Sequence, residues 1–200
     1  MIITLNGIQL DFTLEKENTV GEVLSAIEQN CAQNNATITS ISIDDKILSE
    51  KDFSEIFNAS LDSYNTIALE TISEVDVFNL LANMQNFLQD LVEKMLQIPV
   101  LLQSNKDTEV SSIVVTFVDV FSYINKTFYF TSIFPESFQN LTVDGQLAGD
   151  FMQDFMPILK DFEGSLESGD TVLTSDLAEY EIAPRLESLI ETSKLYNELV

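Results

Sequence analysis

The amino-acid sequence predicts an α+β protein in which a small strand-and-helix domain, residues 1–73, precedes a helical domain, residues 74–200. Two patterns predict this class. In the first seventy residues, short apolar runs are separated by turn-forming residues, which is typical of strands. From residue 73 onward, apolar residues recur three and four positions apart, which is typical of amphipathic helices. With 45% hydrophobic residues, the 200-residue chain can bury a core in each domain.

The chain opens with a predicted hairpin. Its first strand is residues 3–5, and its second begins at Ile8 and continues in alternation through Phe12 and Leu14. Between the strands lies Asn6-Gly7, the dipeptide that best tolerates the two positive φ angles of a type I′ turn. We therefore expect a tight two-residue connection.

A helix is predicted to begin after Thr19. Thr19 suits the N-cap, and Glu22 three residues later completes a capping-box pattern. The apolar face of this helix is formed by Val20, Val23, Leu24 and Ile27. The polar run at residues 29–35 predicts its end.

Three more strands are predicted in the first domain, at residues 38–43, 47–48 and 66–72. A turn at residues 44–46 joins the first two. The segment before the last strand contains Phe53, Ile56, Phe57 and Leu61, and we expect it to be irregular.

This order of strand, strand, helix, strand, short strand and strand resembles the ubiquitin-like β-grasp fold. The opening hairpin, the Thr-capped helix at 19–27 and the entry to the last strand at 64–67 lie where that fold would place them. The resemblance implies a small scaffold used for docking. Because the chain continues past Ile72 instead of ending in Gly-Gly, covalent tagging and sulfur transfer are not expected.

The second domain is predicted to be an α-helical bundle of about four helices. Ser73 can cap the first helix, with Asp76 in its first turn, and Pro99 ends or kinks it. Pro184 interrupts the last helix, which starts near Thr174 or Ser175. The apolar periodicity covers residues 77–95, 110–128, 147–162 and 177–199.

Residues 169–184 are similar to a pattern of uncharacterised bacterial helical proteins. The pattern is Gly-Asp-x-Val-x-x-x-Asp-Leu-x-Glu-Tyr-Glu-x-x-Pro, and the resemblance implies no activity. Within it, Ser175 can cap a helix and Tyr180 can direct its hydroxyl to a partner. We interpret the segment as a packing corner, with a ligand site as the alternative.

Charge and composition exclude several function classes. The chain has 33 acidic and 9 basic residues, a net charge of -24, which disfavours contact with nucleic-acid phosphates and with anionic membranes. It has no histidine, so Ser-His and Cys-His catalytic pairs and His-ligated metals are absent. Cys31 stands alone, so no intrachain disulfide forms, and we interpret it as a small buried apolar residue.

The sequence also predicts a cytoplasmic location. The first seven residues form a strand pattern instead of a secretion signal. The apolar run at 110–134 contains Asp119, Asn125 and Lys126, which favours a buried helix over a membrane span.

Carboxylates are the remaining candidates for catalysis or metal binding. Three acidic pairs are spaced suitably: Asp44 with Asp45, Asp150 with Asp154, and Glu163 with Glu167. None is completed by the further ligands that a di-metal or EF-hand site requires. We interpret them as solvated acids and predict no catalytic residue, no metal site and no cofactor.

The resulting hypothesis is a non-enzymatic protein that binds another protein, as an adaptor or in the manner of the secretion and flagellar export chaperones that the acidic helical part resembles. Its partner is an unidentified protein, and a homodimer is compatible with the sequence. The aromatic residues Phe117, Phe121, Phe151 and Phe155 are the predicted protein-binding groove, or else part of the core. Two alternatives stay open: an acidic mimic of nucleic acid that binds a basic protein, and an enzyme that uses carboxylates alone.

Overall fold

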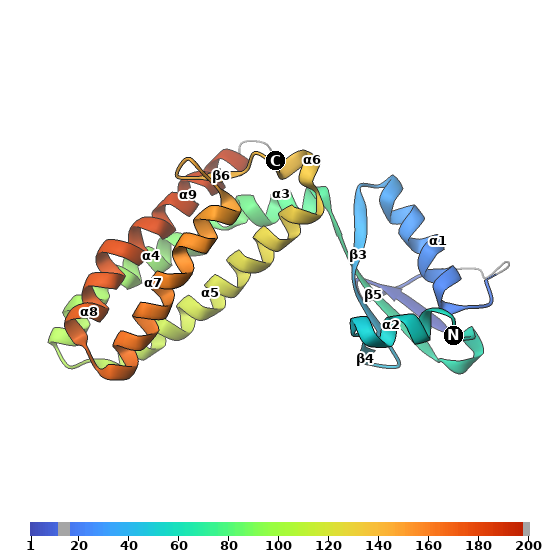
Figure 1. Ribbon diagram of the computed structural model, residues 1–200, viewed down its shortest axis with the longest axis horizontal. Coiled ribbons are helices and arrows are strands. Elements are labelled where there is room, and N and C mark those ends of the chain that lie inside the picture. Colours follow the sequence, from blue (N-terminus) through green and yellow to red (C-terminus); the bar gives the residue numbers. More distant parts are fainter. Residues whose placement is uncertain (12–16, 198–200) are drawn as a thin grey trace. The chain divides into compact units, whose positions relative to one another are not determined.

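The computed structural model describes residues 1–11 and 17–197. It has the predicted α+β class, and the chain divides into two compact units, Met1–Asp76 and Val77–Val200. In the described residues, the first unit combines a sheet with α-helices, and the second is almost entirely helical (Figure 1).

A five-stranded mixed sheet organises the first unit. The strand order is β2-β1-β5-β3-β4, with β1 and β5 parallel and the other neighbouring strands antiparallel. Its elements are β1 (Ile2–Leu5), β2 (Ile8–Gln9), α1 (Val20–Gln33), β3 (Ala36–Ile43), β4 (Lys46–Ile47), α2 (Glu50–Phe57), the 3-10 turn η1 (Leu61–Ser63) and β5 (Thr66–Ser73).

Aliphatic residues of α1 and of the central strands form the core of this unit. On β5, Ile67 and Leu69 are buried whereas Ala68 and Glu70 are exposed, so one face of the strand packs inward. The helix contributes the apolar face that its sequence predicted: Val20, Val23, Leu24 and Ile27, all buried.

The local predictions for the first unit are largely confirmed. Asn6 and Gly7 have φ angles of 49° and 79°, as a type I′ turn between β1 and β2 requires. Thr19 and Glu22 form the expected capping box, and α1 continues to Gln33, beyond the start of the polar run. The predicted continuation of the second strand through Phe12 and Leu14 lies outside the described residues.

One local prediction is wrong: the segment expected to be irregular contains α2, an eight-residue helix. Ser49 is its N-cap, and the Asp52 carboxylate accepts hydrogen bonds from the Ser49 hydroxyl and backbone N–H, at 2.8 and 3.2 Å. Phe53, Ile56 and Phe57 then recur with helical spacing. A capped start and an apolar stripe were therefore both present in the sequence.

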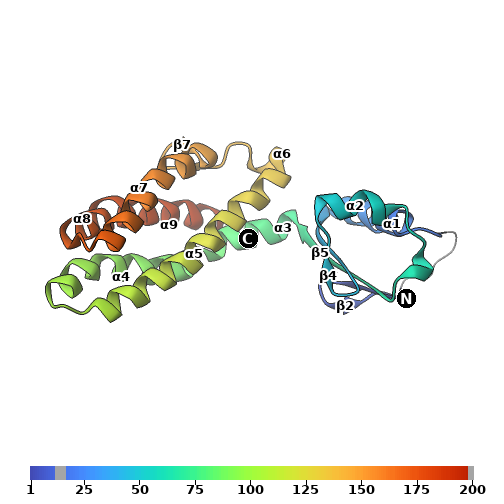
Figure 2. The same ribbon diagram turned by 60° about the horizontal axis from the view of Figure 1, so that its bottom comes forward.

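The second unit is a bundle in which α4 packs against α5 and against α9, and residues of α8 lie beside both α4 and α7 (Figure 2). Its elements are α3 (Glu74–Asn83), α4 (Gln85–Gln103), α5 (Asp107–Ile133), α6 (Pro135–Phe138), β6 (Thr142–Val143), β7 (Gln146–Leu147), α7 (Ala148–Ser168), α8 (Thr171–Asp176), the π-helical segment η2 (Leu177–Ile182) and α9 (Ala183–Asn197).

The first predicted helix of this unit is interrupted at Met84, between α3 and α4. The fully buried Ser193 of α9 forms hydrogen bonds with backbone groups on both sides of this interruption. Its hydroxyl donates to the Leu81 and Ala82 carbonyls at 2.6 and 3.1 Å and accepts from the Gln85 N–H at 3.0 Å. The Leu81 carbonyl also accepts from the Met84 N–H at 3.3 Å, whereas the Gln85 N–H, which would donate to the Leu81 carbonyl in an unbroken helix, donates to the distant serine instead. Pro99, by contrast, does not end α4, which continues to Gln103.

Pro184 coincides with a change of helical register. A proline has no N–H to donate to the carbonyl four residues earlier. Immediately before it, the Ala183 N–H bonds to the Ala178 carbonyl five residues back, and Leu177–Ile182 is π-helical. The Arg185 guanidinium donates to the Glu181 carbonyl and carboxylate, at 2.9 and 2.7 Å, and so supports this wider turn.

The predicted cap at Ser175 is wrong. Asp170 caps α8 instead, because its side chain accepts from the Leu173 N–H at 3.0 Å. Gly169, with φ of 69°, ends α7 in the left-handed conformation, so the next helix begins several residues earlier than expected. Ser175 lies inside the helix and donates to the Thr171 carbonyl at 2.7 Å.

Among the helices of the described residues, none is long and apolar enough to cross a membrane.

Candidate functional site

An open groove lies between α1, β3 and α2 in the first unit. It consists of two adjoining depressions, of about 370 and 500 Å³, that share Ile38, Ile41 and Phe53. We call it the β3 groove. Its lining residues are Leu24, Ser25, Glu28, Gln29, Thr37, Ile38, Thr39, Ser40, Ile41, Ile47, Leu48, Ser49, Glu50, Phe53 and Phe57.

Polar contacts at the first turn of α2 hold this helix over the groove. Lys46 of β4 forms an ion pair with Asp52, with Nζ and Oδ1 3.1 Å apart. The hydrogen bond from the Ser49 hydroxyl, followed by those from the Lys46 ammonium and the Ser49 backbone N–H, lowers the pKa of the Asp52 carboxyl. The turn before α2 is thus tied to its first residues, and this orients the side chains that follow.

A glycine allows α1 and α2 to approach closely. A Cβ atom added at Gly21 would lie 2.5 Å from ring carbons of Phe57. Phe57 in turn packs against Phe53, with ring centroids 5.4 Å apart. Gly21 therefore determines where the aromatic pair of α2 sits on α1.

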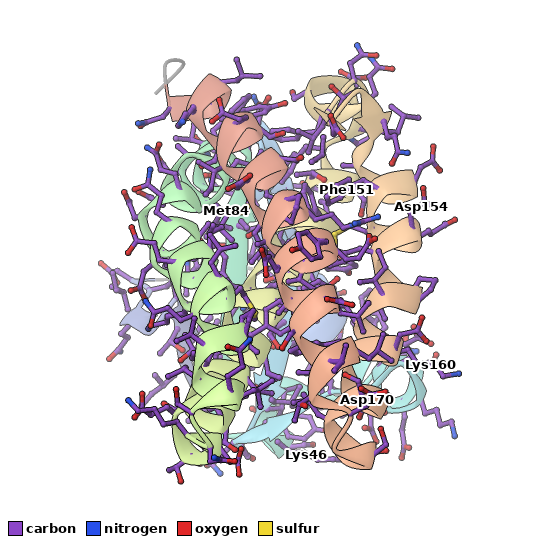
Figure 3. The ribbon with its side chains drawn as sticks, turned by 90° about the vertical axis from the view of Figure 1, so that its left-hand side faces the viewer. Lys46, Met84, Phe151, Asp154, Lys160 and Asp170 are labelled. Carbon is purple, nitrogen blue, oxygen red and sulfur yellow. The ribbon has the colours of Figure 1, made fainter. Side chains whose placement is uncertain are left out.

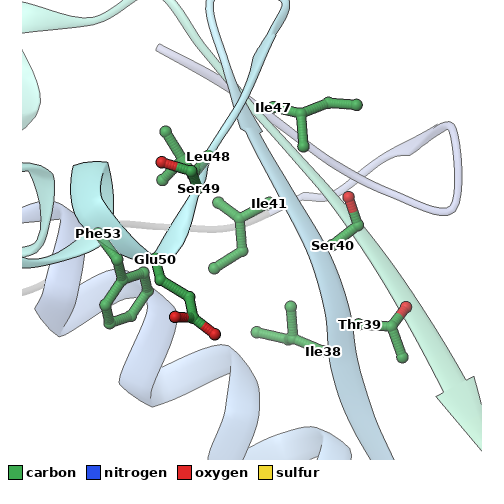
Figure 4. A pocket seen from close by; sticks show the side chains of 9 residues that line it. All are labelled: Ile38, Thr39, Ser40, Ile41, Ile47, Leu48, Ser49, Glu50 and Phe53. Atoms are coloured by element: carbon green, nitrogen blue, oxygen red, sulfur yellow. The ribbon is translucent and has the colours of Figure 1, made fainter.

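The floor of the β3 groove is apolar and accessible. Ile38 and Ile41 are half-buried, and Phe53 is 39% exposed. Figure 4 shows Ile38, Ile41, Leu48 and Phe53 turned toward one another on one side of β3. This side faces α1 and α2, and the chain leaves its apolar surface only partly covered.

One carboxylate blocks the outer edge of β3 beside the groove. The pairing of β4 reaches only the end of β3, at Ser42 and Ile43. Farther along, Glu28 of α1 accepts from the Ile38 N–H at 2.9 Å and from the Thr37 hydroxyl at 2.7 Å. Because an acid occupies this edge, addition of a further strand at Ile38 is disfavoured.

The groove carries negative charge. Among its lining residues, all of which are described, the charged ones are Glu28 and Glu50. Glu28 is engaged by β3, whereas the exposed Glu50 side chain forms no hydrogen bond or ion pair with the described residues. Figure 4 shows the Glu50 carboxylate near the Phe53 ring. An apolar floor is therefore combined with an unpaired acid.

Two ionisable residues near the sheet have structural roles. Asp44 Oδ1 accepts from the N–H groups of Asn65 and Thr66, at 3.0 and 2.9 Å, and these bonds lower the pKa of its carboxyl. Burial raises the pKa of the Cys31 thiol, and the charge of Glu28 raises it further. Cys31 is thus held as a thiol, which is a much poorer nucleophile than the thiolate.

The four phenylalanines of the predicted groove come together in the second unit. Phe121 of α5 meets Phe155 of α7 edge to face at 5.6 Å, with neighbouring contacts to Phe117 and Phe151. Phe155 is fully buried, Phe117 and Phe151 are each 5% exposed, and Phe121 is half-buried. Figure 3 shows Phe151 turned into the bundle, whereas Asp154 is on the outer side of α7. Most of this aromatic surface is covered by the chain itself.

The acidic pairs do not assemble into a metal site. Within residues 1–11 and 17–197, no group of three or more Asp, Glu or Cys side chains could hold an ion. Asp45, Asp150, Asp154, Glu163 and Glu167 are all exposed.

The residues of the β3 groove were missed by sequence reasoning because α2 was not recognised. The available signal was Ser49 with Asp52 three residues later, followed by Phe53, Ile56 and Phe57. That pattern predicts a capped helix with an aromatic stripe. Its position beside Ile38 and Ile41 depends on tertiary contacts.

Both units are similar in sequence to known protein families, and the chain as a whole is similar to a bacterial protein. Residues 1–73 match the family model described as the TP0873 N-terminal domain, and residues 79–192 match that of a domain of unknown function, DUF8042. An uncharacterized protein of Treponema pallidum (strain Nichols) is 31% identical over 189 residues, 94% of this chain and 94% of its own length. No solved structure matches.

Proposed function

We propose that this chain, which belongs to the same two-domain bacterial family as the Treponema pallidum protein, is a non-enzymatic adaptor that binds another protein through its first unit. The observation that carries the proposal is the β3 groove. Exposed apolar surface beside polar rims is a common property of protein-binding sites.

The topology of the first unit supports its assignment as a ubiquitin-like β-grasp domain. Along the chain, the strands and the long helix follow the predicted order β1, β2, α1, β3, β4 and β5, with α2 inserted before β5, and β1 and β5 lie side by side as a parallel pair. The helix α1 packs its apolar face on that sheet. Such a domain offers a rigid scaffold on which a docking surface can be built.

The chemistry of the groove favours binding over catalysis. Its polar lining consists of Ser, Thr and Gln side chains and the two glutamates, and Cys31 is buried with a raised thiol pKa. Activated nucleophiles and general bases require perturbed ionisable groups inside the site. Covering the apolar floor with a partner side chain, by contrast, removes apolar surface from water and so favours binding.

Photo-crosslinking in the cells that produce the protein tests this function. A benzoylphenylalanine is placed at position 53 in the groove and, in a second variant, at position 118, where Val118 is 56% exposed on α5. We expect position 53 to give a discrete covalent adduct with one protein. Mass spectrometry of the adduct identifies that protein.

Position 118 is the matched control because it is an exposed apolar residue outside the first unit. The adduct at position 53 should disappear when Ile41→Ser is added, while the amount of folded protein stays constant by circular dichroism. Absence of any adduct at position 53, or the same adducts at both positions, would falsify the proposal.

A further inference from the structure

We infer that the β3 groove receives a segment of the partner protein in which an arginine is flanked by aliphatic side chains. This inference rests on the proposed function and specifies the chemistry of the occupant. It follows from the charge of the groove, from the arrangement of Glu50 and Phe53 on α2, and from the apolar floor beside them.

The negative charge of the groove favours a positively charged occupant. The charged lining residues, Glu28 and Glu50, are both acids, and the whole chain has a net charge of -24. A segment with carboxylates would be repelled, and so would a second copy of this chain. A cationic segment is attracted at long range and can pair with the free carboxylate of Glu50.

Geometry favours arginine as the cation. Glu50 and Phe53 are three positions apart on α2, so their side chains are neighbours on its surface. Figure 4 shows both near Ile38, with the carboxylate beside the ring. A planar guanidinium can stack on an aromatic face and donate two hydrogen bonds to a carboxylate, whereas an ammonium cannot do both in one plane.

The apolar floor accounts for the flanking aliphatic residues. Ile38 and Ile41 lie beside Phe53 and are half-buried, and the methylene groups of an arginine or a neighbouring Leu or Ile would cover them. Because Glu28 occupies the β3 edge at Ile38, the segment binds through side chains and does not extend the sheet there.

Selection from a library of random linear peptides displayed on phage tests the inference, with the purified full chain as the target at low ionic strength. We expect enriched peptides to contain an arginine between aliphatic residues. Their affinity is then measured by isothermal titration calorimetry. Replacing the arginine of the peptide by lysine should weaken binding, and so should added salt.

Two acid variants on the same helix provide the matched comparison. Glu50→Gln should weaken binding about three- to fivefold at low ionic strength, as loss of one partly exposed ion pair predicts. Glu55→Gln removes an equal charge from an exposed residue that does not line the groove, and it should leave the affinity unchanged. Charge reversal in Glu50→Lys should have a larger effect than Glu50→Gln.

The outcomes separate this inference from the proposed function. If the enriched peptides lack arginine, or bind Glu50→Gln as tightly as the original chain, the inferred occupant is wrong. The groove would still be a docking site if Phe53→Ala abolished their binding. If no peptide is enriched, a short segment is not the occupant, and the crosslinking at position 53 decides the function independently.

Discussion

Both units contain a pair of phenylalanine rings at nearly the same distance, but in different surroundings. In the second unit, Phe121 and Phe155 have centroids 5.6 Å apart, and Phe155 is fully buried. In the first unit, Phe53 and Phe57 have centroids 5.4 Å apart, and Phe53 is 39% exposed. The same contact stabilises a core in one unit and leaves apolar surface open in the other.

This difference in exposure indicates which aromatic rings can still contribute to the binding of a partner. A ring that is already buried has given up its contact with water, so its contribution belongs to the free energy of folding. A half-exposed ring retains apolar area that a partner can still cover. An aromatic cluster in the sequence therefore does not by itself identify a binding surface.

The largest change in the free energy of unfolding is expected from truncating one phenylalanine ring in each unit. Phe155→Ala should lower the free energy of unfolding by about 3–5 kcal/mol because it leaves a cavity in the bundle. Phe53→Ala should lower it by about 1 kcal/mol or less, as is usual for partly exposed positions. Urea unfolding followed by far-ultraviolet circular dichroism measures both, and equal losses would contradict the comparison.

A smaller effect is expected from adding one methyl group at a glycine in each unit. Gly21→Ala should lower the free energy of unfolding by about 1–2 kcal/mol, because the new Cβ forces the Phe57 ring to move. Gly164→Ala on α7 meets nothing within 4 Å and should raise it by about 0.5–1 kcal/mol, the difference in helix propensity. Thermal unfolding of the two variants should show shifts of opposite sign.

The smallest effect concerns Asp44, at the turn between β3 and β4, and it depends on pH. Because the folded state lowers the pKa of Asp44, its charged carboxylate stabilises the fold above the pKa of the unfolded chain. That contribution is lost as the pH falls through the folded pKa. Asp44→Asn should therefore be less stable than the original chain at pH 7, with a difference that vanishes in acid.

Thermal unfolding between neutral and acidic pH checks this expectation. Asparagine tolerates the φ of 46° at this position, so the substitution changes charge with little change in backbone strain. Asp45→Asn, in the same turn, is the control because the Asp45 carboxylate forms no hydrogen bond with the described residues. A constant difference across the pH range would show that the Asp44 bonds do not depend on ionisation.

Local sequence signals predicted the elements whose ends are determined by neighbouring residues. Asn6-Gly7, the capping box of Thr19 and the cap at Ser73 each act over a few residues, so the opening hairpin, α1 and the start of α3 are found where expected. The cap at Ser49 acts in the same way, so the start of α2 was also encoded in the local sequence.

Distant contacts decided the features that sequence patterns did not indicate. At the interruption at Met84, the hydroxyl of Ser193, more than one hundred residues away, accepts from the Gln85 N–H and donates to the Leu81 carbonyl, two groups that would bond to each other in an unbroken helix. The aromatic cluster around Phe155 could have been core or surface on its spacing alone. Its burial depends on how α5 and α7 pack.

The sequence by itself determined the α+β class, the acidic character of the surface, the absence of histidine chemistry and most helix and strand starts, because these depend on composition and short-range hydrogen bonds. Only the tertiary structure decided which apolar residues stay accessible. Ile38 and Ile41 of β3 follow α1 closely along the chain, whereas Phe53 comes from α2, and how far each of them is covered depends on how these elements pack when the whole unit folds.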